Sequence, residues 1–245
     1  MSSLWPIYYR IYEKFIRNDV IFSQIFKDHG LLGGVSSLLS IGSGEGKLEI
    51  QLAKELGIML GYIDLSEFAS RIFNAEAEAN DVEHLIIERH YDTLQTFESQ
   101  YQYDLVISIH SWYRIGNDRI LLQKALDLVR PGGKLFISVS SKDDELRKEL
   151  SQYTQDLIAG EDFSEWASSE GFEHECFTHT LPMPIKDFFC EGSLTGEAKD
   201  LIGFLNKKSW DELPDEFKMK AQQILCSRQP QGSVSRVDAC LLFSK

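Results

Sequence analysis

Cysteine and proline are scarce in this chain of 245 residues, which contains 4 cysteines and 6 prolines. The cysteines are Cys176, Cys190, Cys226 and Cys240, and they lack the short paired spacings of zinc-binding motifs. We therefore expect no metal site. We also expect the cysteines to be free thiols in a reducing, cytoplasmic compartment, where disulfides are rare.

Positive charge and long apolar runs are also lacking, which argues against two kinds of partner. The chain has 38 acidic and 25 basic side chains, for a net charge of −13. Nucleic-acid binders need clustered Lys and Arg for phosphate contacts, and no such cluster is present. No run is long enough to span a bilayer, and the first residues do not resemble a secretion signal. We expect neither nucleic-acid nor membrane partners, and a monomer or weak dimer.

Apolar runs and helical periodicities alternate through the first part of the chain. This alternation is typical of a doubly wound α/β fold, in which helices cover both faces of a parallel sheet. Proline and glycine in the segment Arg130-Pro131-Gly132-Gly133 are predicted to end a helix and form the turn before the next strand. Strands are predicted at 37–41, 59–63, 84–88, 104–109 and 134–139, and helices at 6–28, 46–56, 66–79, 117–129 and 143–158.

The rhythm changes after about residue 160, where strands and helices no longer alternate. The last strand is predicted to be the antiparallel hairpin partner of strand 172–180, completing a mostly parallel, seven-stranded sheet. We expect one functional domain at 35–245, preceded by a helical lid at 1–34 and carrying a helical insertion at about 181–228. The remaining predicted elements are helices at 163–169, 196–207 and 214–226 and the last strand at 234–243.

A glycine-rich turn follows the first predicted strand, in the segment 42–46. Glycines allow a ligand close to the backbone, and the next helix offers unpaired N–H groups. The second predicted strand ends at Asp64, where a carboxylate can accept hydrogen bonds from a ribose diol. A plain strand-to-helix turn is the alternative for the glycines alone. The pattern favours a ribose-bearing cofactor but not NAD, whose third glycine would stand at the position of Lys47.

Together, the turn, Asp64 and Pro131-Gly132-Gly133 resemble class I S-adenosylmethionine-dependent methyltransferases. The segment 41–50, with Ser40 before it, is similar to the glycine loop and first helix of the histamine N-methyltransferase family. The resemblance continues over nearly the whole chain. The matching segments are Asp64-Leu65-Ser66, His90-Tyr91-Asp92-Thr93, 104–113, 171–177, 187–192 and 201–205.

This resemblance implies S-adenosyl-L-methionine as the cofactor and a Rossmann-like, class I methyltransferase fold. Asp92 and Thr93 stand where the family holds the adenine amino group, although a local Asx or ST turn explains them equally well. The implied cofactor-binding residues are Gly42, Ser43, Gly44, Gly46, Asp64, Leu65, Asp92, Thr93, Ile109 and His110.

The resemblance also places the methyl acceptor near the end of the fourth strand. His110 is a candidate general base and Tyr113 a candidate wall of the site, and we name both as catalytic candidates. A histidine bonded to the backbone at a strand end is the alternative for His110. The implied acceptor-binding residues are Tyr8, Tyr12, Tyr113, Arg114, Phe188 and Arg236.

Two departures from the family argue against histamine itself as the acceptor. The N-terminal helix has no acid at the position of the family's histamine-binding glutamate, and Arg236 replaces an asparagine near the C-terminus. Arg236 favours an anionic acceptor, unless it is a surface strand residue. We predict methyl transfer to a small molecule, at an amine or imidazole nitrogen. The alternatives are a small-molecule O-methyltransferase and a non-catalytic S-adenosylmethionine-binding protein.

Overall fold

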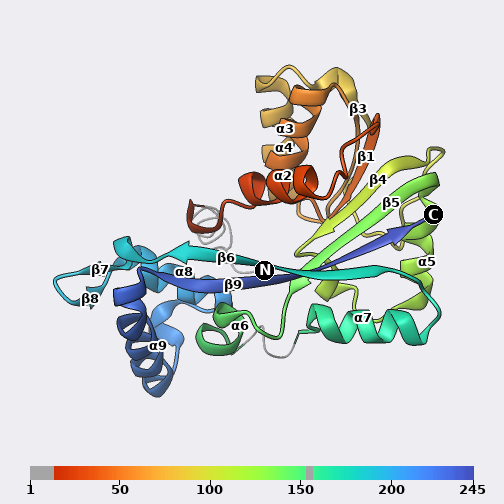
Figure 1. The fold of residues 1–245 in the computed structure, drawn as a ribbon. Helices are drawn as coiled ribbons and strands as arrows, with labels where there is room; N and C mark the ends of the chain where they lie inside the picture. Colours follow the sequence, from red (N-terminus) through yellow and green to blue (C-terminus); the bar gives the residue numbers. More distant parts are fainter. Residues whose placement is uncertain (1–13, 153–156) are drawn as a thin grey trace. The chain divides into compact units, whose positions relative to one another are not determined.

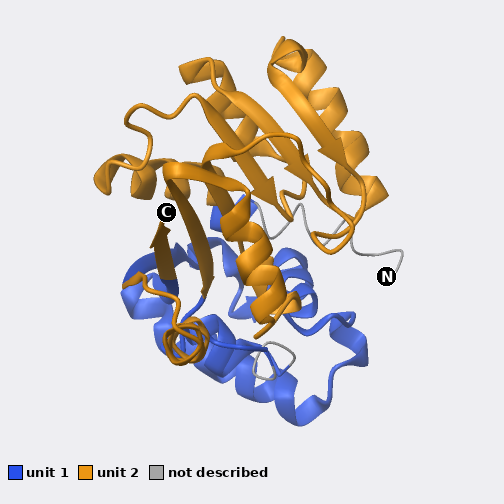
Figure 2. Ribbon diagram, turned by 90° about the vertical axis from the view of Figure 1, so that its right-hand side faces the viewer, with its two compact units in different colours: residues 1–17, 140–159, 178–239 blue, residues 18–139, 160–177, 240–245 orange. Residues whose placement is uncertain are grey.

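The computed structural model describes residues 14–152 and 157–245, so the predicted acceptor residues Tyr8 and Tyr12 lie outside the described residues. The chain forms two compact units, coloured separately in Figure 2. Unit 1 contains residues 1–17, 140–159 and 178–239, and unit 2 contains residues 18–139, 160–177 and 240–245. The first boundary, between residues 17 and 18, falls inside the segment 1–34 that the sequence predicts to be a lid.

A seven-stranded sheet has the order β3-β2-β1-β4-β5-β9-β6 (Figure 1). β1 pairs in parallel with β2 and β4, β2 with β3, and β4 with β5. β9 runs antiparallel to β5, because Gly132 near the start of β5 donates to the carbonyl of Lys245 just after β9, whereas Ser141 just after β5 donates to the carbonyl of Val237 within β9. The predicted fold class is confirmed. The strands are β1 (Ser37–Ile41), β2 (Met59–Ile63), β3 (Ile86–His90), β4 (Tyr103–Ile109), β5 (Val129–Ser140), β6 (Glu175–Pro184) and β9 (Ser233–Ser244).

The five described α-helices of unit 2 lie beside its strands β1 to β4, α2 to α4 on one side and α5 and α7 on the other (Figure 1). Side chains cap the N-termini of two of these helices. At the start of α4, Oγ of Ser66 accepts a hydrogen bond from the Ala69 N–H. Asp118 caps α5 in the same way. The helices are α2 (Asn18–Asp28), α3 (Lys47–Leu56), α4 (Glu67–Ala79), α5 (Arg119–Asp127) and α7 (Gly160–Ser169).

Helix α2 contributes three fully buried side chains to the core of unit 2: Phe22, Ile25 and Phe26. The Phe26 ring meets the Phe136 ring of β5 edge to face, with ring centroids 5.0 Å apart. This part of the predicted lid is therefore a core helix of unit 2, because its apolar side chains pack against the sheet.

Several predicted elements have other bounds in the structure, and contacts between distant residues explain two of the differences. The segment 130–133 is the first part of β5 rather than a turn, since its backbone groups pair with the end of β9. A Cβ on Gly133 would lie 2.7 Å from the Asp104 carbonyl oxygen, so the close approach of β4 accounts for that glycine. Of the helix predicted at 143–158, residues 145–150 form α6 (Glu145–Leu150), which ends there because Ser151 is extended and its Oγ donates to the Leu205 carbonyl. Residues 153–156 lie outside the described residues.

Unit 1 has its own apolar core, formed by side chains that include Leu146, Ile185, Phe188, Leu201 and Leu225. The helices predicted at 196–207 and 214–226 are present as α8 (Gly196–Asn206) and α9 (Asp215–Arg228). A short hairpin joins β7 (Phe189–Cys190) to β8 (Ser193–Leu194). Short 3-10 helices include η2 (Trp112–Arg114) in unit 2 and η4 (Lys186–Phe188) and η6 (Gln229–Gln231) in unit 1. Among the described helices, none is long and apolar enough to cross a membrane.

Candidate functional site

The glycine turn between β1 and α3 is held against the end of β2. The N–H groups of Gly42 and Ser43 both donate to the Ile63 carbonyl, at 2.8 and 3.3 Å. Gly42, Gly44 and Gly46 have φ angles of 73°, 58° and 67°, in the left-handed region that side chains with a Cβ rarely adopt. The turn therefore needs glycine for its backbone conformation, whether or not a ligand approaches it.

Two of these glycines are also required by packing. A Cβ on Gly42 would lie 2.4 Å from Cβ of Ser111, and one on Gly46 would lie 2.3 Å from the Phe73 ring. Ser111 is fixed in turn, because its Oγ donates to the Ile41 carbonyl at 2.7 Å. Sequence reasoning missed Ser111 and Phe73, since neither belongs to a local pattern that points to the turn.

The structure brings Asp64 and the glycine turn together. Oδ2 of Asp64 accepts a hydrogen bond from the Gly44 N–H at 2.8 Å, and Oδ1 accepts one from the Ser66 N–H at 2.7 Å. Burial raises the pKa of the Asp64 carboxyl, while these two hydrogen bonds and the nearby Arg114 charge oppose the rise. Each carboxylate oxygen has a second lone pair, so the oriented group is able to accept two further hydrogen bonds.

Tyr62, in β2, also contacts this turn and was not among the predicted site residues. Its Oη donates to the Gly44 carbonyl at 2.9 Å and lies 3.2 Å from Oγ of Ser70. Its ring stacks on Phe73, with ring centroids 4.0 Å apart. Burial raises the pKa of Tyr62, so the phenol stays protonated and is able to donate.

Two acidic side chains near the turn were also absent from the site residues predicted from the sequence. Oγ of Ser40 donates to Oε1 of the buried Glu49 at 2.5 Å, so α3 supplies a carboxylate beside position 40. Glu45, within the turn, is only 5% exposed, and its Oε1 has no hydrogen-bond partner among the described residues. Nζ of Lys47 lies 3.3 Å from the other oxygen. An unsatisfied buried carboxylate oxygen suits a ligand that brings a cation or a hydrogen-bond donor.

The predicted adenine-binding residues follow β3. The Thr93 N–H donates to Oδ1 of Asp92 at 2.8 Å, a contact between neighbouring residues rather than the bond to the second residue on that defines an Asx turn. The Thr93 carbonyl accepts the N–H and the Oγ1 hydroxyl of Thr96. Leu65 lies directly after Asp64 and is 52% exposed, so this apolar side chain is accessible to a ligand. The cofactor roles of these residues stay predictions.

His110 follows β4 with a φ of 51°, an uncommon conformation for a residue other than glycine. Its N–H donates to the Ser138 carbonyl at 2.9 Å, and its ring lies edge-on to Phe22 with centroids 5.9 Å apart. Ile109 and His110 are both half-buried. Residues in such strained conformations concentrate at functional sites, which motivates the role given to His110.

Tyr113 and Arg114 lie in η2, directly after this strand. Tyr113 is half-buried, and the Arg114 guanidinium lies 5.9 Å from the centre of its ring. Arg114 is exposed, and its charge opposes the rise that burial causes in the pKa of Asp64. All described cofactor candidates and these two acceptor candidates therefore belong to unit 2.

The other described acceptor candidates, Phe188 and Arg236, belong to unit 1. Phe188 is fully buried and meets Phe15 edge to face, with centroids 4.8 Å apart. Arg236 is 3% exposed, so the alternative of a surface strand residue is wrong. Its Nη2 bonds Oδ2 of Asp238 at 2.8 Å and its Nε bonds Oδ1 at 3.3 Å. An anionic acceptor would have to compete with the Asp238 carboxylate for this guanidinium.

Comparisons with known proteins give the family. A model of the methyltransferase domain matches residues 17–177, which is more than half of the chain. Histamine N-methyltransferase of Xenopus tropicalis is 23% identical over 255 residues, covering 92% of this chain and 84% of that protein.

Solved structures share the fold. A SAM-dependent methyltransferase from Thiobacillus denitrificans, in complex with S-adenosyl-L-homocysteine, has a TM-score of 0.60 and 14% identity over 100% of this chain and 99% of that one. Coclaurine N-methyltransferase, bound to N-methylheliamine and SAH, has a TM-score of 0.57 and 13% identity over 92% of this chain and 72% of that one. The predicted enzyme class, and S-adenosyl-L-methionine as its cofactor, agree with the family match. The chain belongs to the methyltransferase domain family.

Proposed function

We propose that this methyltransferase transfers a methyl group from S-adenosyl-L-methionine to a nitrogen atom of a small molecule, of the amine or imidazole type. The hydrogen bond of 2.8 Å between the Gly44 N–H and the Asp64 carboxylate carries the cofactor part, because it joins the two ligand-facing features into one site. The setting that we propose is cytoplasmic, with the protein acting as a monomer or weak dimer.

The residues of unit 2 fit the parts of this cofactor by their chemistry. Asp64, held by two backbone N–H groups, has lone pairs left for the two ribose hydroxyls. Gly42, Ser43, Gly44 and Gly46 are proposed to hold the methionine part, and the unpartnered oxygen of Glu45 suits its positive charge. Leu65, Asp92 and Thr93 are proposed to contact the adenine.

S-adenosylmethionine supplies, when bound, a methyl group that a sulfonium already activates, so the protein's task is alignment and proton handling. Ile109 and His110, at the end of β4, are proposed to lie next to this methyl group. His110 would accept the proton that the acceptor nitrogen loses, and Tyr113 would exclude water beside it. An amine or imidazole nitrogen attacks with its own lone pair. The site therefore needs only to align the acceptor, remove a proton and exclude water.

The nitrogen acceptor is supported by the similarity to histamine N-methyltransferase over 92% of this chain. The pairing of Arg236 with Asp238 removes the main argument for an anionic acceptor. Methyl transfer to oxygen is the alternative that a base at His110 would favour. A cofactor-binding protein without turnover is the other alternative, because fold alone does not decide activity.

The deciding experiment is calorimetry with S-adenosylmethionine and S-adenosylhomocysteine, followed by a screen for S-adenosylhomocysteine release. The screen compares amines, imidazoles and amino acids with matched alcohols and phenols. Binding plus release with a nitrogen acceptor is the expected result. Release with the oxygen set alone would reverse the choice of atom, and binding without release from either set would favour the non-catalytic alternative. Absence of binding would overturn the cofactor proposal.

A further inference from the structure

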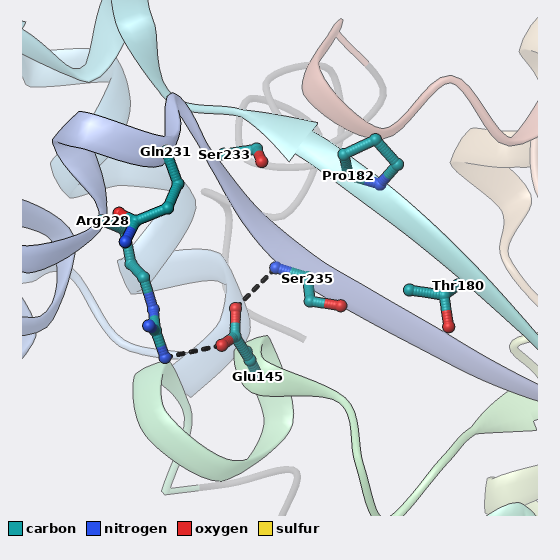
Figure 3. A pocket seen from close by; sticks show the side chains of 7 residues that line it. All are labelled: Glu145, Thr180, Pro182, Arg228, Gln231, Ser233 and Ser235. Atoms are coloured by element: carbon teal, nitrogen blue, oxygen red, sulfur yellow. Dashed lines mark hydrogen bonds and ion pairs between the residues drawn. The ribbon is translucent and has the colours of Figure 1, made fainter.

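Unit 1 contains a hollow of about 250 Å³ that no predicted site residue lines (Figure 3). Its wall is formed by Thr180 and Pro182 of β6 and by Ser233 and Ser235 of β9. These positions alternate along two neighbouring strands, so their side chains share a face of the sheet. Val234, between the two serines, and Met183, directly after Pro182, are buried in the core of unit 1.

An ion pair forms the charged side of the hollow. Nη2 of Arg228, from α9, lies 2.7 Å from Oε1 of Glu145 in α6, and the Ser235 N–H donates to the other glutamate oxygen at 2.6 Å. Figure 3 shows both interactions. Glu145 and Arg228 are the single acid and the single base among the described lining residues. The two charges of the lining therefore cancel, but a positive and a negative group stand side by side in its wall.

Arg228 retains an unused donor at this place. Its Nε is buried and has no hydrogen-bond partner among the described residues. A buried donor without an acceptor is costly, and such groups in folded proteins are nearly always satisfied. Nε itself is too buried for a ligand to reach, but the Arg228 side chain is 38% exposed and bonds the described residues through Nη2, so its Nη1 group remains for an acceptor in the hollow.

From these observations we infer that the hollow binds a small zwitterionic amino acid, with its carboxylate on Arg228 and its ammonium on Glu145. A free anion would face the negative charge of Glu145, and a free cation would face Arg228, whereas a zwitterion pairs with both charges at once. The hydroxyls of Thr180, Ser233 and Ser235 accept or donate to the remaining polar atoms. The volume lies just below the ~300–1,000 Å³ of sites for drug-sized ligands, which fits a ligand of amino-acid size.

The inference goes beyond methyl transfer, and its test needs no cofactor. The protein is titrated separately with alanine and with two analogues that each carry one of its charges. Propionate lacks the ammonium, and ethylamine lacks the carboxylate. Binding is followed by nuclear magnetic resonance at the Ser235 amide, which bonds Glu145, and at the Gly44 amide of the glycine turn. We expect a saturable shift at Ser235, with alanine binding about tenfold or more tightly than either analogue.

Two pairs of variants locate the site. Thr180 lines the hollow and is exposed, so phenylalanine at this position fits the fold and fills the hollow. Thr180→Phe should therefore abolish the shift of the Ser235 amide on addition of alanine. Thr178→Phe makes the same change at an exposed position of β6 outside the hollow and should leave the response intact. Glu145→Gln should weaken alanine binding at least about fivefold and propionate binding less, because only alanine brings an ammonium. Arg228→Gln should weaken alanine and propionate alike.

Three results would overturn the inference. One is the absence of any response at Ser235 up to the solubility limit of alanine, in protein whose thermal unfolding shows an intact fold. Another is equal affinity for alanine and either analogue, which would leave a site for a simple ion. The third is an alanine response that survives Thr180→Phe or that appears at Gly44 alone, which would move the binding to the proposed methyltransferase site.

Discussion

The Gly44 N–H donates a hydrogen bond to the carboxylate of Asp64, 20 residues further along the chain. The same glycine accepts a hydrogen bond at its carbonyl from the Tyr62 hydroxyl. The turn after β1 and the end of β2 are therefore connected through both backbone groups of one residue. A change at either strand end is expected to reach the other, which makes this connection the natural target for the first tests.

Replacing Asp64 with alanine is expected to weaken S-adenosylmethionine binding by about 1–3 kcal/mol, because hydrogen-bond donors of the cofactor lose their acceptor. Calorimetry measures the effect, and thermal unfolding checks the fold. Glu67→Ala is the matched control, since Glu67 is exposed and pairs with Arg71 on the surface of α4. Equal affinities of Asp64→Ala and the unmodified protein would refute the proposed role of Asp64.

Replacing His110 with glutamine is expected to lower turnover about 10²- to 10⁴-fold at saturating cofactor, the usual contribution of a general base. The affinity for S-adenosylhomocysteine should change little, because His110 is proposed to lie next to the methyl group that this product lacks. The acidic limb of the pH–rate profile should disappear. Steady-state kinetics with an acceptor from the screen provide the measurement. A variant that works at full rate would reduce His110 to a packing residue.

Gly46→Ala and Gly57→Ala should differ in their cost to stability. Both glycines have a φ near 67°, but a new Cβ meets the Phe73 ring at position 46 and nothing within 4 Å at position 57. We expect Gly57→Ala to cost about 1–2 kcal/mol for the backbone alone. Gly46→Ala should cost about 1–3 kcal/mol more for overpacking.

The free energy of unfolding in urea measures the difference between these two variants. In the background of Gly46→Ala, Phe73→Leu should recover part of the loss, because it removes the clashing ring. Equal costs at the two positions would show that the contact with Phe73 does not constrain the turn.

Breaking the buried pair of Arg236 and Asp238 should destabilise the protein more than replacing it. Arg236→Ala leaves the Asp238 carboxylate buried without this partner, which is expected to cost about 3–5 kcal/mol. The double variant Arg236→Met with Asp238→Leu should recover most of that loss, because apolar side chains carry no desolvation penalty. Urea unfolding of the single and double variants tests this. A double variant as unstable as the single one would mean that the pair is not the main interaction of Arg236.

Asp144 should make the stability of the protein fall as the pH rises through 6. Burial raises the pKa of its carboxyl to about 6, against the effect of hydrogen bonds from the Arg147 and Val237 N–H groups and of the Arg236 charge, while Asp238 adds to the rise. Between pH 4 and 6 the folded protein then holds a proton that the unfolded chain has lost. The contribution of Asp144 is therefore most favourable below about pH 4, and it is lost by pH 7, a change of about 2–3 kcal/mol.

The pH dependence of unfolding in Asp144→Asn, subtracted from that of the unmodified protein, isolates this contribution. Asparagine keeps one acceptor oxygen but does not titrate, so the variant should show a flatter profile between pH 4.5 and 7.5. A difference that does not change with pH would contradict the raised pKa of Asp144.

Much of unit 2 could be predicted from the sequence because its signals are local. Period-2 and period-3.6 apolar patterns gave β1, α3, β2 and α4 within one residue of their observed bounds. The glycine turn and Asp64 were found because each stands at the end of a predicted strand, and parallel strands bring such ends to one edge of the sheet. That adjacency is now seen in the hydrogen bond between Asp64 and Gly44.

The misplaced elements share a cause. The segment 130–133 looks like a turn by composition, but its backbone groups pair with residues at the far end of the chain. The predicted helix 143–158 ends early because Ser151 bonds Leu205, which is 54 positions away. Long-range hydrogen bonds of this kind override local propensity, and no window of neighbouring residues contains them.

The amino-acid order alone was sufficient for the fold class and for the strand ends where a cofactor is expected, because periodicity and turn residues are local features, and its motifs carried the resemblance to the family. Tertiary structure decided which side chains are already engaged. It paired Arg236 with Asp238, placed Glu49 beside Ser40, buried α2 in the core, and paired Glu145 with Arg228 at the wall of one hollow. These partners meet only after folding, so their charges and hydrogen bonds have no signature in the sequence.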